Sequence, residues 1–167
     1  MRIPSPNSFQ TATNIKHSKC SRCHHHFAIM VTLSSDSIKD EAHRALFQKY
    51  LGYCNAHDWQ GMQSLYASPI SINDEPWSPT QVTDQFKPLV AAFPDWRWDV
   101  RHVTTDGHIF SFHLKVTGTH QGTFQGIEPT GRKVSTTQYT LYHLEDGKFT
   151  EVWDLVDWES LLKQIQN

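Results

Sequence analysis

A change in hydrophobic periodicity at residue 94 most strongly constrains the fold. Before it, apolar residues recur every three to four positions, as on one face of a helix. The predicted helices cover residues 38–54, 59–66 and 81–93, the last kinked near Pro88. After it, apolar and polar residues alternate, which is typical of half-buried strands. The predicted strands cover residues 96–102, 109–118, 134–144 and 149–155, and a short helix follows at 158–166. This order predicts an α+β fold with three N-terminal helices on one face of a curved antiparallel sheet.

Length and composition favour one domain. The chain has 167 residues, of which 38% are hydrophobic, enough for a core. No apolar run approaches the roughly 20 residues that a membrane-spanning helix needs, so we expect no membrane insertion. Residues 31–167 hold 11 of the 15 Lys and Arg residues and all 17 acids, a negative balance that argues against nucleic acid as a partner. Three cysteines give no disulfide framework, which favours a cytoplasmic location.

The first thirty residues differ from the rest. They are basic, contain no acid and show little apolar periodicity, so we predict a disordered or artefactual extension ahead of a domain at 31–167. Two alternatives remain open. The cluster Cys20-Ser-Arg-Cys23-His24 has the spacing of a c-type haem attachment site and, with the two following histidines, could bind zinc. The composition is also similar to that of an organellar transit peptide.

Most catalytic sequence motifs are absent. The chain contains no P-loop, no G-x-G-x-x-G, no G-x-S-x-G and no H-E-x-x-H, so nucleotide and nucleophilic-serine chemistry have no motif in their favour. The seven histidines after Met30 never pair at metal-ligand spacing, and we predict no metal site in this part. Cys54, Trp96 and Trp98 fit the helical or alternating pattern of core residues.

Asp154 is the strongest catalytic candidate. On the strand at 149–155, alternation places it on the same face as Val152. An apolar pocket disfavours the ionised form of a carboxyl group, and a raised pKa suits a general base or acid. The alternative is a structural role, with the carboxylate capping a turn or pairing with a cation. His113 could donate to a carbonyl or relay a proton if its face lines the pocket; otherwise it is a packed or surface residue.

Four further residues are candidate substrate contacts. Tyr139 and Tyr142 lie on the neighbouring strand, on opposite faces, and a buried tyrosine hydroxyl needs a partner that a substrate oxygen can supply. Asp74 could be a second pocket carboxylate or could simply form a turn, and Trp153 adjoins Asp154. Asp157, by contrast, reads as the N-cap of the last helix.

Several motifs resemble one family. The run Gly118-Thr119-His120-x-Gly122-x-Phe124-x-Gly126-Ile127-x-Pro129-Thr130-Gly131-Arg132 resembles a conserved run of SnoaL-like polyketide cyclases. So do Phe93-Pro94-Asp95 before the first long strand, Asp146-Gly147-Lys148-x-x-Glu151-x-Trp153-Asp154-x-x-Asp157 near the end, and Leu161-Leu162-x-Gln164 in the last helix. The resemblance covers residues 40 to 166 in order; residues 1–30 lie outside it.

The resemblance implies a fold and a chemistry. The fold would be a nuclear-transport-factor-2-like cone, a barrel-like sheet with helices closing one side of a deep apolar pocket, usually in a homodimer. Family cyclases use no cofactor. A carboxylate on the last strand, Asp154 here, removes an acidic C–H proton, and polar neighbours hold the enolate oxygen during ring closure. Val152 stands where some members have a histidine, so His113, with Tyr139 or Asp74, becomes the candidate acid partner.

The sequence thus predicts a cofactor-independent cyclase or isomerase of secondary metabolism. Its substrate would be a hydrophobic small molecule similar to a polyketide or terpenoid. Two alternatives stay open, because one fold hosts many functions. The first is a module that binds a small molecule or a protein without chemistry. The second is a dehydratase or hydrolase on the same scaffold.

Overall fold

The computed structural model describes residues 35–166, which belong to the compact unit Leu33–Asn167. The predicted extension at residues 1–30, with its cysteine–histidine cluster, lies outside the described residues. The helices are α1 (Ser35–Ala56), α2 (Trp59–Gln63), α3 (Pro79–Asp84), α4 (Phe86–Ala92) and α5 (Trp158–Gln166). The strands are β1 (Tyr66–Ile72), β2 (Glu75–Trp77), β3 (Arg97–Asp106), β4 (Ile109–Thr119), β5 (Lys133–Glu145) and β6 (Lys148–Val156).

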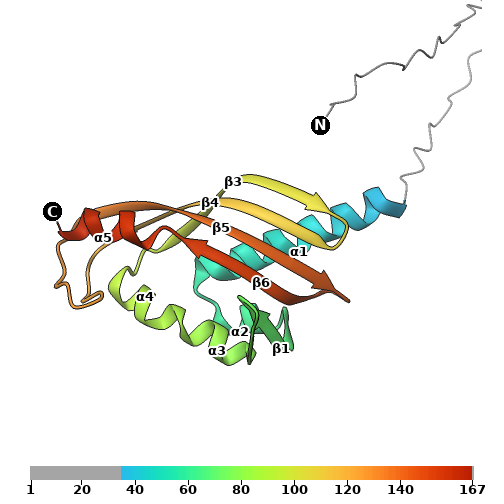
Figure 1. Cartoon of the computed structure of the whole chain (residues 1–167), viewed down its shortest axis with the longest axis horizontal. Helices are drawn as coiled ribbons and strands as arrows, with labels where there is room; N and C mark the ends of the chain where they lie inside the picture. Colours follow the sequence, from blue (N-terminus) through green and yellow to red (C-terminus); the bar gives the residue numbers. More distant parts are fainter. Residues whose placement is uncertain (1–34, 167) are drawn as a thin grey trace, which may run out of the picture. The chain divides into compact units, whose positions relative to one another are not determined.

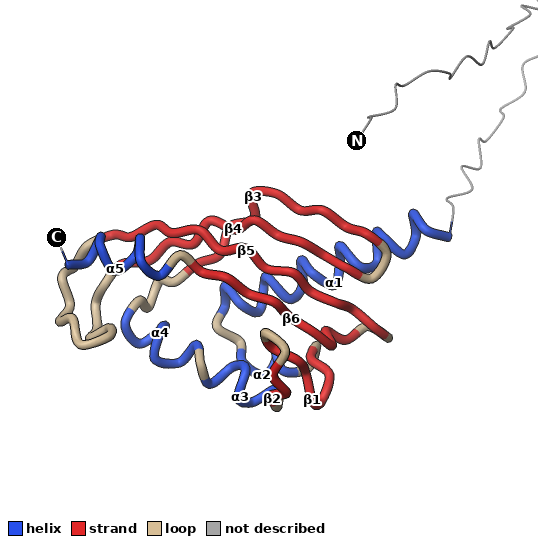
Figure 2. The backbone as a smooth tube through the Cα atoms, viewed as in Figure 1, coloured by secondary structure: helices blue, strands red, loops and turns tan. Residues whose placement is uncertain are grey.

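The α+β prediction is confirmed, with a correction to the sheet. The six strands form one unclosed sheet in the order β2-β1-β6-β5-β4-β3. Neighbouring strands are antiparallel except β1 and β6, which run parallel, so the sheet is mixed and not wholly antiparallel. The parallel pair arises because β1 follows the helices and enters the sheet beside the last long strand, as Figure 2 shows at the edge next to β6.

One face of the long strands carries the core. Phe110, Phe112, Leu114 and Val116 alternate along β4 and are all buried, as their spacing predicts. Phe47 of α1 stacks on Phe112 with 3.6 Å between ring centroids. Figure 1 shows α3 and α4 facing the long strands while α1 runs alongside them. The helices therefore cover the inner face, and the opposite, outer face of β3–β6 remains uncovered within the described chain.

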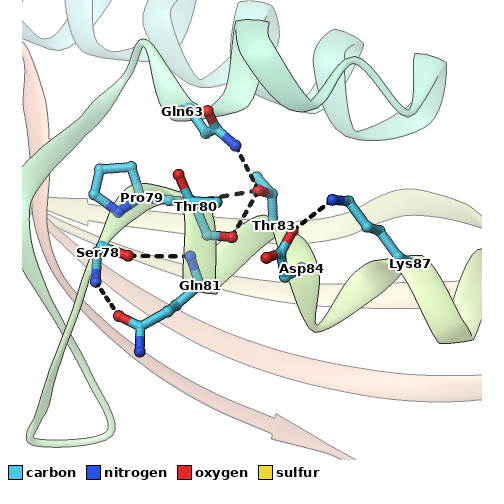
Figure 3. A network of polar contacts seen from close by, with 8 residues as sticks. All are labelled: Gln63, Ser78, Pro79, Thr80, Gln81, Thr83, Asp84 and Lys87. Carbon is cyan, nitrogen blue, oxygen red and sulfur yellow. Dashed lines mark hydrogen bonds and ion pairs between the residues drawn. The ribbon is translucent and has the colours of Figure 1, made fainter.

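The segment over the inner face is two short helices where one kinked helix was predicted. The break falls at Gln85, between α3 and α4, and not at Pro88. Pro88 lies in the first turn of α4, where a missing backbone N–H costs no helical hydrogen bond. At the start of α3, Ser78 and Gln81 form a capping box, drawn in Figure 3.

A tight hairpin joins β1 and β2. Asn73 and Asp74 occupy its two central positions with φ of 48° and 70°, the pattern of a type I′ turn. The structure pairs Ile70 with Trp77 and Ile72 with Glu75 across this hairpin. The hairpin turn reaches β6, because the backbone N–H of Asn73 donates to the carbonyl of Val152 at 2.8 Å.

The family motifs close the end of the sheet near α4. Asp95 accepts hydrogen bonds from the backbone N–H and the hydroxyl of Thr119, at 2.5 and 2.7 Å. Gly122 lies so close to α4 that an added Cβ would be 2.6 Å from the carbonyl oxygen of Ala91. His120 is fully buried and stacks on Phe93. These residues thus fix the loop between β4 and β5 against the helical side.

Candidate active site

A cavity of about 330 Å³ lies between α4, with Gln85 just before it, and the inner face of the sheet. Eight of its thirteen lining residues are aromatic or aliphatic, four carry amides and one is charged, and polar atoms form the larger part of the exposed wall. Its lining residues are Asn73, Gln85, Phe86, Pro88, Leu89, Trp96, Trp98, Phe124, Gln125, Gln138, Asp154, Val156 and Trp158. The charged group is Asp154, so the cavity offers a ligand one carboxylate, several amides and flat apolar surfaces.

Asp154 is held through one of its two oxygens. Its Oδ1 accepts hydrogen bonds from Gln138 Nε2 at 2.6 Å and from the hydroxyl of Thr140 at 2.8 Å. Within residues 35–166, no side chain donates a hydrogen bond to Oδ2 and no cation pairs with the carboxylate. Burial raises the pKa of Asp154, and the hydrogen bonds from Gln138, Thr140 and the backbone N–H of Leu155 only partly oppose this. The arrangement leaves Oδ2 available to take a proton.

A chain of hydrogen bonds leads from Asp154 back to α1. Trp98 Nε1 donates to Gln138 Oε1 at 2.8 Å. Asn55 of α1 binds both backbone groups of Trp98: its Nδ2 donates to the carbonyl at 3.0 Å, and its Oδ1 accepts from the N–H at 2.8 Å. Residues from α1, β3, β5 and β6 therefore fix the environment of the carboxylate.

The predicted contacts Asp74 and Trp153 bind each other outside the cavity. Trp153 Nε1 donates to Asp74 Oδ1 at 2.9 Å, which ties the β1–β2 turn to the outer side of β6. Neither residue lines the cavity. The neighbouring Asn73 does line it, and its Oδ1 accepts from the backbone N–H of Asp154 at 2.8 Å. Asp74 is thus a turn residue, the second of the two interpretations that the sequence left open.

Tyr142 is a core residue. It faces inward, as the strand alternation predicts, but it is only 6% exposed and packs against Phe47, Tyr50 and Phe149. Burial raises the pKa of its hydroxyl well above the usual value. It does not line the cavity. Tyr142 is therefore not placed to contact a ligand in this cavity.

His113 and Tyr139 lie on the outer face of the sheet, and neither lines the cavity that Asp154 faces. Across the sheet, His113 pairs with Tyr139, and Tyr139 with Leu155. Asp154 belongs to the adjacent inward row, opposite Thr140. His113 instead stacks on Tyr139 and places its Nδ1 3.0 Å from Nδ1 of His102. His113 therefore lies across the sheet from the carboxylate, whereas Tyr139 and Asp154 both border a second, open hollow over β5 and β6.

Sequence reasoning missed the two residues that hold Asp154. Gln138 and Thr140 are buried on the inner face of β5, between the apolar residues Val134 and Leu144 on the same face. The sequence does contain a signal for them. Both are polar residues at positions that alternation directs inward, and a buried polar side chain needs a hydrogen-bond partner. Applying the alternation rule to residues 134–144 would have aimed both side chains at the pocket.

Two further features concern metal binding and membrane insertion. Within residues 35–166, no three His, Cys, Asp or Glu side chains gather closely enough to hold a metal ion. In the same stretch, no helix combines the length and apolar character needed to cross a membrane.

Comparisons with known proteins identify relatives of this fold. A family model described as SnoaL-like polyketide cyclase matches residues 44–165. AclR from Streptomyces galilaeus, described provisionally as a hydroxylase, is 26% identical, with a TM-score of 0.69 over 75% of this chain and 96% of its own. IdmH from Streptomyces antibioticus, described provisionally as a polyketide cyclase, is 21% identical, with a TM-score of 0.69 over 74% and 98%. A SnoaL-like polyketide cyclase from Agrobacterium tumefaciens is 20% identical, with a TM-score of 0.64 over 72% and 95%. The comparison with curated proteins finds no match.

Proposed function

This chain belongs to the SnoaL-like polyketide cyclase family, and from that premise we propose that it is a cofactor-independent cyclase or isomerase of secondary metabolism. The observation that supports the proposal best is the state of Asp154. One oxygen of its carboxylate is bound by Gln138 and Thr140, while Oδ2 has no side-chain partner within the described chain. Together with a pKa raised by burial, this suits a general base that faces a cavity.

The reaction can be written with Asp154 alone moving the proton. Its Oδ2 takes a proton from a carbon next to a carbonyl group, which leaves an enolate. The enolate carbon attacks a second carbonyl in the same molecule, a C–C bond forms, and the oxygen of that carbonyl becomes an alkoxide. The alkoxide recovers the proton from Asp154, so the carboxylate is regenerated. The amides of Gln85 and Gln125 line the cavity and are the proposed donors to the enolate oxygen.

The proposed substrate is an uncharged, hydrophobic small molecule similar to a polyketide or terpenoid. The flat walls that Trp96, Phe124 and Trp158 contribute suit a ring system or a folded chain. None of the lining residues is a Lys, Arg or His that could neutralise an anion. We also propose a cytoplasmic location, because three cysteines give no disulfide framework.

Deuterium exchange tests the proposed base. The purified protein would be incubated in D₂O with a panel of 1,3-dicarbonyl and poly-β-ketone compounds, and loss of the α-proton signal followed by NMR. We expect wild-type protein to accelerate exchange or ring closure of a bound compound and Asp154→Asn to lower the rate at least 100-fold, a typical contribution of acid–base catalysis. Asp99→Asn is the matched control, because Asp99 lies on the outer face, paired with Arg97.

Two results would contradict the proposal. If Asp154→Asn keeps the wild-type rate within a few-fold, Asp154 is not the base. If the protein binds a compound and neither exchanges nor converts any that it binds, the alternative of a non-catalytic binding module is favoured.

We also propose that the chain forms a homodimer through the outer face of β4–β6. On this face Leu155 is 71% exposed and Tyr139 is 55% exposed. Exposed apolar side chains grouped on one sheet face are typical of a surface that packs against another molecule. A second copy can supply the complementary surface by two-fold symmetry.

A further inference from the structure

We propose that Trp98 is a positioning residue whose indole N–H keeps the amide of Gln138 turned with its NH₂ group toward Asp154. The inference rests on the proposed role of Asp154. It concerns how the carboxylate is prepared, and Trp98 itself transfers no proton.

The argument starts from what each group can donate. An indole nitrogen has one N–H and no lone pair to accept with, so it only donates. Because Trp98 Nε1 lies 2.8 Å from one end of the Gln138 amide, that end must be the oxygen. The other end is then the NH₂ group, which donates to Asp154 Oδ1 at 2.6 Å. A turned amide would set N–H against N–H on one side and oxygen against the carboxylate on the other.

Burial makes this choice matter. Trp98 is 6% exposed and Gln138 is 7% exposed, so bulk water cannot replace a lost partner. The indole is itself fixed, because Asn55 holds both backbone groups of Trp98 and the ring of Phe86 meets it edge-on at 5.8 Å. The indole N–H of Trp98, which orients the amide of Gln138, is therefore held in a fixed position.

The consequence falls on the protonation of Asp154. With the amide locked, a donor faces Oδ1 whether the carboxyl group is ionised or protonated, and a donor stabilises the ionised form more strongly than the protonated one. Without the indole N–H, the amide can turn when Asp154 is protonated and accept a hydrogen bond from the acid. The protonated form then gains stability, so loss of the Trp98 donor should raise the pKa of Asp154.

A direct titration tests this without a substrate. Asp154 would be followed by NMR of ¹³C-labelled aspartate carboxyl groups across pH in the full chain, with its signal assigned from Asp154→Asn. We expect Trp98→Phe, which keeps an aromatic ring, to move the Asp154 midpoint to higher pH. The matched control is Trp77→Phe, since Trp77 lies on β2 and does not line the cavity. That control should leave the midpoint unchanged.

A double variant separates positioning from a general loosening of the core. In a Gln138→Leu background there is no amide left to turn, so adding Trp98→Phe should produce no further shift. If Trp98→Phe shifts the midpoint equally with and without Gln138, or does not shift it, the positioning role is wrong. The titration reads the carboxyl group alone, so it can fail while Asp154 still acts as base, and it can succeed while the deuterium exchange fails.

Discussion

Two aspartates of this chain lie in opposite electrostatic surroundings. Asp95 is exposed at the FPD turn, and the hydrogen bonds from Thr119 lower its pKa. Asp154 faces the cavity, and desolvation raises its pKa. The first carboxylate therefore stabilises the fold when ionised, whereas the second is ionised at a cost to the fold. This difference separates a structural carboxylate from a catalytic candidate on physical grounds.

The opposite shifts predict opposite effects of the same substitution. For Asp95, whose folded pKa is depressed, stability is present above the unfolded pKa and lost as pH falls through the folded pKa; Asp95→Asn should therefore lower the melting temperature near pH 7. The folded pKa of Asp154 is raised above 3.8, so its ionisation lowers the stability of the fold as pH rises from the unfolded pKa through the folded pKa. Asp154→Asn should therefore raise the melting temperature near pH 7.

Thermal melts of both variants and wild type from about pH 3 to about pH 7 check this pair. Both differences should shrink as the pH falls, and that of Asp95 disappears only below its depressed folded pKa. A lower melting temperature for Asp154→Asn at neutral pH would mean that its hydrogen bonds outweigh desolvation.

Among the elements, α4 lines the cavity on the helical side, and α3 leads directly into it through Gln85. Ser78 and Gln81 bind each other's backbone N–H groups at the start of α3. Thr83, which is fully buried, accepts from Gln63 Nε2 at 2.7 Å and so ties α3 to α2, as Figure 3 shows. These contacts hold a six-residue helix that is too short to be stable alone.

Removing the N-cap of α3 should destabilise this helix. Ser78→Ala deletes the side-chain acceptor for the N–H of Gln81, and an N-cap of this kind contributes about 1 kcal/mol. We expect the melting temperature to fall by roughly 2–5 °C and amide exchange in α3 to accelerate. Ser111→Ala, an exposed position on β4, should leave both unchanged. Equal effects of the two substitutions would show that the capping box does not anchor α3.

The same elements show what local patterns can and cannot predict. Periodicity was sufficient for the long strands and for the inward direction of Asp154, because alternation depends on neighbours in the chain. It was not sufficient for the parallel pairing of β1 with β6, which depends on bonds between distant residues such as Asn73 and Val152. The position of His113 follows from the same rule. Alternation places it with Lys115, on the face opposite to Phe112, so it lies outside the cavity on the inner face.

At the scale of the whole molecule, the two faces of the sheet have different surroundings. The inner face is covered by helices and holds the cavity that carries the proposed active site. The outer face of β3–β6 has no covering element within residues 35–166, yet it carries Leu155, Tyr139 and the stacked ring of His113. A face of this composition is stabilised if a second copy removes it from water.

Leu155→Glu tests that arrangement. Two-fold packing would bring the substituted residues of both copies into one interface, where two buried, unpaired carboxylates would oppose association. We expect wild-type protein to sediment as a dimer at micromolar concentration and Leu155→Glu to sediment as a monomer with its fold intact by circular dichroism. Gln60→Glu adds the same charge at an exposed position of α2 and should stay dimeric. A monomeric wild type, or a dimer that tolerates Leu155→Glu, would place the interface elsewhere or remove it.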